Sequence, residues 1–161
     1  MTNKHTASSS NILENRIFSD DLSGQIIGTG HKHDSGENRA KLLPFELFEK
    51  KRGDSTVLIL QGIYNTQTVK YLKPRLYELA GEWEGKTIIG LKKILFIDVS
   101  CLAAFLKAHK LAESKKGKIV FINKNEKIKR AFQLTKIDSI LNIVTSLEEA
   151  EDLLNEEAHC L

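Results

Sequence analysis

The stretch Lys86-Thr-Ile-Ile-Gly-Leu-Lys-Lys-Ile-Leu-Phe-Ile-Asp98-Val99-Ser100-Cys101-Leu102 decides the fold of this chain. Its β-branched and aliphatic residues at 87–91 predict a strand that is buried on both faces. A short turn and a second apolar run at 94–97 then lead to Asp98, whose carboxylate suits the N-cap of a helix. The residues that follow at helical spacing are Leu102, Phe105, Leu106, His109 and Ala112. Such a corner is either purely structural or makes the helix N-terminus a surface that presents or receives negative charge.

Upstream of this corner the pattern predicts a hairpin and a helix. Residues 45–49 alternate as a half-exposed strand, 52–55 form a turn, and 56–60 form a buried strand. Apolar residues then recur at helical spacing over 69–79. Pro74 lies within this helical pattern, so the helix is either kinked there or has its regular part starting at Pro74.

Downstream of the corner, strands and helices continue to alternate. The pattern predicts a strand at 119–122, a helix at 126–134, a short strand at 140–144 and a final helix that begins after Ser146 in a capping box. An order in which helices connect successive strands predicts an α/β fold with mainly parallel strands and right-handed crossovers.

The composition divides the chain into three parts. Residues 1–44 are polar and lack apolar periodicity, so we expect a disordered or weakly ordered extension. Residues 45–154 form the expected domain, and 155–161 form a C-terminal tail. An alternative for part of the extension is a short amphipathic helix that docks on the domain or on a partner; its apolar residues are Ile12, Leu13, Ile17 and Phe18.

Several classes of function are disfavoured by the sequence. The glycines near Lys32 lack the ending of a phosphate loop, and His31, His33 and Asp34 have no second ligand cluster, so we expect no cofactor and no metal. The domain offers no pair of nucleophile and base, so we expect no enzyme. A net charge of +3 does not favour direct binding of nucleic acid. Only two cysteines, no apolar run of membrane-spanning length and no visible signal peptide favour a cytoplasmic protein.

The order and spacing of several motifs resemble the STAS domain of bacterial anti-sigma factor antagonists, or anti-anti-sigma factors. That family carries Asp-Ser-Ser-Gly-Leu at the start of its central helix, where this chain has Asp98-Val99-Ser100-Cys101-Leu102. The other matching positions are Gly62, Asn65, Thr68, Gly117, Lys129 to Phe132 and Ser146 to Ala150. The resemblance covers roughly 45–154 and implies one STAS-like domain with a mixed, mostly parallel sheet and about four helices.

The resemblance also implies a non-enzymatic regulator of transcription. Such an antagonist binds an anti-sigma factor, often a serine protein kinase of the histidine-kinase-like ATPase fold, and thereby frees a sigma factor. Phosphorylation of the first serine after the aspartate ends that interaction, because it adds roughly −1.5 to −2 charge at the contact. Mapped onto this chain, the expected partner-binding residues are Asn65, Thr66, Asp98, Val99, Ser100 and Cys101.

This chain departs from the family at the regulatory position. Val99 stands where the phosphorylated serine is expected and has no hydroxyl. Three hypotheses follow: constitutive binding, a displaced phosphorylation site at Ser100, or a scaffold or regulator of another kind. A subunit of an ABC-type lipid transport ATPase is an alternative, because similar domains occur there. Cys101 is either a small core residue or a redox-sensitive thiol with a lowered pKa.

Overall fold

Six strands form one sheet in the order in which they occur along the chain. The computed structural model describes residues 25–29 and 45–156. Its elements are β1 (Gln25–Thr29), β2 (Phe45–Arg52), β3 (Ser55–Tyr64), α2 (Val69–Ala80), β4 (Lys86–Ile97), α3 (Val99–Ser114), β5 (Lys118–Ile122), α4 (Glu126–Leu134), the 3-10 helix η1 (Ile137–Ser139), β6 (Asn142–Val144) and α5 (Leu147–Asn155).

Strand pairing confirms the predicted α/β architecture. β1 pairs with β2 and β2 with β3 in antiparallel fashion, whereas β3, β4, β5 and β6 pair in parallel. Parallel neighbours need a crossover connection, and α2, α3 and α4 supply these connections. With α5 the described part of the chain has the four predicted helices.

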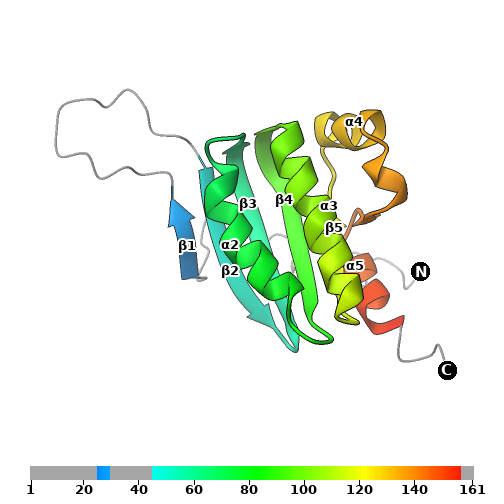
Figure 1. Ribbon diagram of the computed structural model, residues 1–161. Coiled ribbons are helices and arrows are strands. Elements are labelled where there is room, and N and C mark those ends of the chain that lie inside the picture. The colour runs from blue at the N-terminus through cyan, green and yellow to red at the C-terminus, as the bar shows by residue number, and fades with distance from the viewer. Residues whose placement is uncertain (1–24, 30–44, 157–161) are drawn as a thin grey trace, which may run out of the picture.

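Helices cover both faces of the sheet. α2 and α3 lie side by side on one face, seen in front of the strands in Figure 1, and α4 lies near the carboxyl end of β5. Successive residues of β5 belong to the apolar clusters on opposite faces of the sheet. Phe121 belongs to the cluster that contains α2 and α3. Its neighbours Val120 and Ile122 instead pack in the cluster that contains Leu147 of α5. Successive side chains of a strand point to opposite faces, so the buried strands join two apolar layers.

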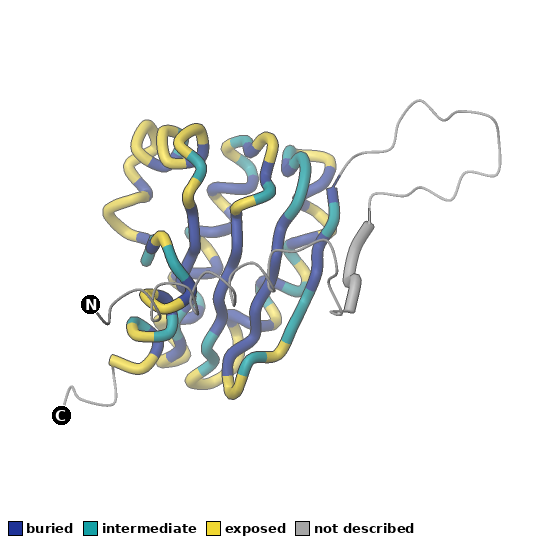
Figure 2. The backbone as a smooth tube through the Cα atoms, turned by 180° about the vertical axis from the view of Figure 1, so that it is seen from behind, coloured by how far each residue is buried: buried dark blue, intermediate teal, exposed yellow. Residues whose placement is uncertain are grey.

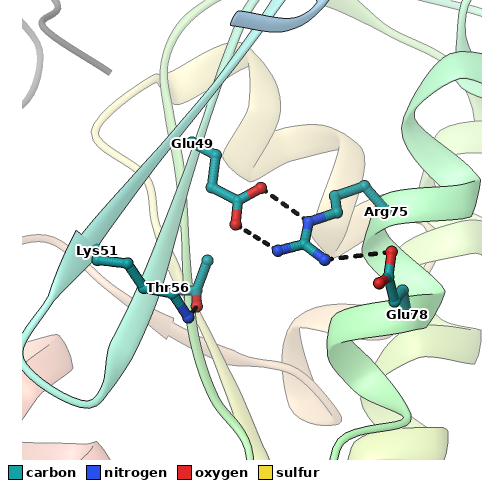
Figure 3. Close-up of polar contacts among 5 residues, drawn as sticks. All are labelled: Glu49, Lys51, Thr56, Arg75 and Glu78. Carbon is teal, nitrogen blue, oxygen red and sulfur yellow. Dashed lines mark hydrogen bonds and ion pairs between the residues drawn. The ribbon is translucent and has the colours of Figure 1, made fainter. Parts of the chain in front are cut away.

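An ion-pair network fixes α2 against β2. Arg75 of α2 donates from Nε to Glu49 of β2 at 2.7 Å and from a second guanidinium nitrogen to the other carboxylate oxygen. Its third nitrogen lies 3.2 Å from Glu78, and Figure 3 shows Arg75 between the two carboxylates. The same view shows Lys51 donating to the hydroxyl of Thr56 across the β2–β3 hairpin, at 2.7 Å. Pro74 lies inside α2, so the helix does not start there.

The predicted strand and turn before Asp98 are one strand. β4 runs without a turn from Lys86 to Ile97, and the turn predicted after Leu91 is wrong. Two register shifts against β3 take its place, each of which adds one residue to β4. They also change which side chains are buried, because Phe96, predicted within an apolar run, is 52% exposed. Such bulges re-aim side chains without ending a strand.

Two other boundaries differ from the prediction. β6 is shorter than the predicted 140–144, because η1 precedes it and Ile140 is exposed. The structure describes one part of the predicted extension, and that part is the strand β1, whose Ile26 pairs with Phe48. The apolar segment 12–18 and the histidine-containing motif around His31 lie outside the described residues. No helix among 25–29 and 45–156 is both long enough and apolar enough to span a membrane.

Candidate functional site

The predicted site lies where β3 and β4 end. These strands are parallel neighbours, so their carboxyl ends meet at one edge of the sheet, and Tyr64 pairs with Ile97. The backbone N–H of Asp98 donates to the carbonyl of Tyr64 at 3.1 Å. The loop before α2 and the start of α3 are therefore adjacent in space.

Asp98 accepts hydrogen bonds with both carboxylate oxygens. Oδ1 accepts from the backbone N–H of Ser100 at 3.0 Å, from that of Cys101 at 3.3 Å and from the Ser100 hydroxyl. Oδ2 accepts from the backbone N–H and the hydroxyl of Thr66, at 3.0 and 3.2 Å. The predicted N-cap is confirmed, and the carboxylate also joins the loops that precede α2 and α3.

These contacts determine the charge state of Asp98. Partial burial by itself raises the pKa of the carboxyl group, but the hydrogen bonds from Ser100, Cys101 and Thr66 outweigh it and hold the pKa below its ordinary value. Asp98 therefore carries its negative charge in the physiological pH range.

Val99 and Ser100 differ in what they present to solvent. Val99, the first residue of α3, is 69% exposed. Ser100 is partly buried, and its hydroxyl donates to Asp98. The position that carries a serine in the resembling family is thus occupied here by an exposed aliphatic side chain.

Asn65 and Thr66 lie beside this helix start. Asn65 Oδ1 accepts from the backbone N–H groups of Gln67 and Thr68 at 2.9 and 3.1 Å, so this side chain shapes its own loop. Thr66 is exposed and holds Asp98. The structure therefore brings five of the six predicted site residues together at one surface: Asn65, Thr66, Asp98, Val99 and Ser100.

Cys101 does not belong to that surface, which corrects its predicted role in partner binding. Its side chain has no exposed area and packs in the cluster beneath α2 and α3. Burial raises the pKa of the Cys101 thiol well above its ordinary value, and the nearby Asp98 charge adds to this effect. A thiol of raised pKa is a poor nucleophile, so the redox alternative is wrong and the core alternative is confirmed.

The sequence prediction missed an apolar patch beside the site, formed by Leu95, Phe96 and Val99. These side chains are 71%, 52% and 69% exposed. β4 pairs with β5 only as far as Gly90, so the end of β4 that carries Leu95 and Phe96 extends beyond β5. An exposed apolar patch of this kind marks interaction surfaces. The sequence alone does not reveal it, because the exposure of the three residues is known only from the structure.

Basic residues that are close in sequence separate in the structure. Lys115 and Lys118 lie at the amino end of β5, whereas Lys124 and Lys127 follow its carboxyl end. The run therefore does not form the single basic face that nucleic-acid binding requires.

Chemistry-bearing groups elsewhere are sparse. His109 is buried on α3, where its Nε2 lies 3.2 Å from Glu113. Among the described residues, no three His, Cys, Asp or Glu side chains gather as metal ligands would. A pocket of about 430 Å³ lies at the ends of β5 and β6 and is lined by Asn123, Asn125 and Phe132 among others, and its lining residues do not include the start of α3.

Comparison with known families gives one match that covers most of the domain. The model of the STAS domain matches residues 48–150. No curated protein matches the chain.

Solved structures of similar fold include anti-sigma factor antagonists from several bacteria. The antagonist from Mycobacterium paratuberculosis has a TM-score of 0.61 at 13% identity, with 68% of this chain and 93% of that chain covered. A putative antagonist from Thermotoga maritima has a TM-score of 0.60 at 23% identity, covering 66% and 92%. The Bacillus cell-fate determinant SpoIIAA in its phosphorylated form has a TM-score of 0.52 at 20% identity, covering 69% and 99%. At these identities the likeness establishes the fold.

Proposed function

Because the chain belongs to the STAS domain family, we propose that it is a cytoplasmic, non-enzymatic regulator of the anti-sigma factor antagonist type. Its partner is an anti-sigma factor or a serine kinase of the histidine-kinase-like ATPase fold. Binding uses a docking tip that consists of Asn65, Thr66, Val99, Ser100 and the apolar patch. The single observation that carries this proposal is the exposed Val99 at a helix start held in place by Asp98.

The docking tip is suited to binding without rearrangement. Asp98 accepts hydrogen bonds from Ser100 at the start of α3 and from Thr66 in the loop before α2. These bonds fix the loop before α2 relative to the start of α3. A surface that is already ordered loses little conformational entropy when it binds. Asp98 therefore acts here as a positioning residue, whereas Val99, Leu95 and Phe96 supply the apolar contact area.

Of the hypotheses for regulation, the geometry favours constitutive binding. Val99 has no oxygen that can accept a phosphoryl group, and the Ser100 hydroxyl is committed to Asp98. A phosphate on Ser100 would place its negative charge beside the carboxylate, and like charges at that distance repel. Phosphopeptide mapping of the protein isolated from its own cell tests this point, and modified Ser100 would restore the displaced-site hypothesis.

The test of the docking tip is the substitution Val99→Glu. Purified anti-sigma factors of the same organism are titrated one by one with the protein by calorimetry. Glutamate adds a negative charge where an apolar contact is proposed, so we expect a loss of about 2 kcal/mol or more, a factor of about 30 in affinity. Val99→Ser, which is small and neutral, should retain most of the affinity.

The matched control is Trp83→Glu, which adds the same charge at another exposed apolar residue. Trp83 is 62% exposed and lies beside Lys116, near the amino ends of β4 and β5. It should leave affinity unchanged. Equal affinities of Val99→Glu and the parent protein for a partner that binds would rule out the docking tip.

A further inference from the structure

One row of side chains crosses the face of the sheet opposite α2 and α3. In register, Phe48 of β2 lies beside Ile59 of β3, which lies beside Gly90 of β4; the row ends with Ile122 of β5 and Val144 of β6. Every member is buried, and Ile59 has no exposed area. Figure 2, which views the molecule from this side, shows buried backbone along the middle of the central strands. The whole row is therefore covered.

α5 covers only one end of this row. It begins at Leu147, directly after β6, and its packing against the sheet is concentrated on β5 and β6. Strands lie about 4.8 Å apart, so Ile59 is roughly 10 Å and Phe48 roughly 14 Å from β5. A helix has a radius of only about 5 Å with its side chains. Side chains of α5 reach Arg52 of β2 through Glu151 and Lys86 of β4 through Asn155, but each of these contacts lies four positions along its strand from the row, that is, from Phe48 and from Gly90.

The buried end of the row therefore needs another cover. Gly90 contributes no side chain, and Ile59 beside it and Phe48 on the next strand are large and apolar, so α5 alone would leave the centre of this face exposed. Apolar side chains that are buried in this way must be in contact with apolar atoms of another part of the protein. Among the described elements none other than α5 belongs to the cluster on this face besides the strands themselves.

The chain outside the described residues includes one segment that fits. Its apolar residues come as two pairs, Ile12 with Leu13 and Ile17 with Phe18. β1 starts at Gln25, which pairs with Glu49, the neighbour of Phe48. The six residues between Phe18 and Gln25 span up to about 20 Å when extended, which is enough to reach Phe48 and Ile59 from the sheet edge.

We propose that residues 12–18 dock on this face of the same chain, over Phe48, Ile59 and Gly90. The segment then completes the apolar layer that α5 begins. The docking tip lies at the carboxyl ends of β3 and β4, so the segment and the partner bind to separate surfaces.

Thiol labelling of the full chain tests the proposal. Ile59→Cys is introduced together with Cys160→Ser, so that residue 59 and the buried Cys101 are the two thiols present. With the segment docked, a maleimide should label residue 59 slowly. Ile17→Asp with Phe18→Asp should accelerate that labelling by about tenfold or more, because docking then requires burial of charge. Ser9→Asp with Ser10→Asp adds the same charge outside the apolar pairs and should change nothing.

Cys101 reports whether the domain remains folded in each variant, because it reacts only if the core opens. If the aspartate pair also exposes Cys101, the milder pair Ile17→Ala with Phe18→Ala replaces it, with a smaller acceleration expected at residue 59 alone. Fast labelling of residue 59 in the parent background, or a rate that none of these substitutions changes, would overturn the proposal. So would protection that varies across an about hundredfold range of protein concentration, since that dependence would assign the face to a second copy.

Discussion

Asp98 is the residue on which the geometry of the site depends. Its folded-state pKa lies below the ordinary value of 3.8, so its ionised form stabilises the native state above that value. This contribution is lost as the pH falls through the folded pKa. Asp98→Asn keeps an N-cap acceptor but turns an amide toward the Thr66 donors. We expect a loss of about 1–2 kcal/mol in the free energy of unfolding at neutral pH.

Urea denaturation at two pH values measures this effect. The difference between the parent protein and Asp98→Asn should be largest near pH 7 and should shrink toward about pH 3, since the asparagine does not titrate. Asp152→Asn, at an exposed position on α5, should stay within about 0.5 kcal/mol of the parent. A difference that is independent of pH would show that the charge of Asp98 does not contribute.

At this scale the sequence predicts local contacts well and distant ones poorly. The N-cap at Asp98 is confirmed because capping depends on residues two and three positions away. The bond from Thr66 to Asp98 joins residues that are 32 positions apart, and it exists only because β3 and β4 end together. The sequence leaves two alternatives for Cys101, the surface and the core, since a position in the first helical turn does not by itself determine which way a side chain faces.

The attachment of α2 to β2 is the contact between elements with the clearest geometry. Hydrogen bonding to Glu49 raises the pKa of Arg75 above its ordinary value, so the guanidinium group remains charged. Arg75→Lys keeps the charge but removes the two-nitrogen fork that Glu49 accepts. We expect the free energy of unfolding to fall by about 1–2 kcal/mol.

Chemical denaturation compares this variant with Arg130→Lys, the same change at an exposed position on α4. The control should be nearly neutral, within about 0.5 kcal/mol. Equal effects of the two substitutions would mean that the paired geometry in Figure 3 adds nothing to the attachment.

At the scale of elements, strong periodicity predicts the helices correctly. The prediction fails inside β4, where the strand changes its environment. The helix predicted after Asp98 is confirmed, as is the capping residue Ser146. The turn predicted between the two apolar runs falls on Lys92 and Lys93. They lie instead where β4 has passed the end of β5, and lysine is common on such unpaired edges.

The whole molecule consists of two apolar layers that share their strands. Leu154 of α5 belongs to the layer opposite α2 and α3 and is 4% exposed. Because every central strand contributes to both layers, we expect Leu154→Ala to weaken the entire domain, by about 2–4 kcal/mol. Circular dichroism and near-ultraviolet spectra recorded during urea unfolding should give coincident transitions for this variant and the parent protein.

Leu134→Ala is the matched control, because Leu134 is 83% exposed at the end of α4. It should change the free energy of unfolding by less than about 0.5 kcal/mol. Separate transitions in Leu154→Ala would contradict the shared-strand argument, since α5 would then unfold independently of the rest.

At the level of the whole molecule, the alternation of strands and helices after Thr56 was enough to predict the parallel sheet. The participation of β1 was not predictable from its own residues. Ile26 and Ile27 are a short apolar pair without period, and a segment of this kind gains order only from the exposed edge of β2. Edge strands depend on a partner that lies elsewhere in the chain.

The two extra residues in β4 cancel each other's effect on the face of the sheet to which later side chains point. From Gly90 to Lys93, β4 advances three residues while β3 advances two. From Ile94 to Phe96, β4 advances two residues while β3 advances one. Each insertion alone reverses the phase of every side chain beyond it, because side chains alternate between the faces of a sheet. Together they cancel, so Ile97 faces the α2 and α3 layer as Leu91 does. Deletion of one of these two residues would therefore turn the side chains between that point and α3 to the opposite face of the sheet. Deletion of both would restore the correct face in a strand that is two residues shorter.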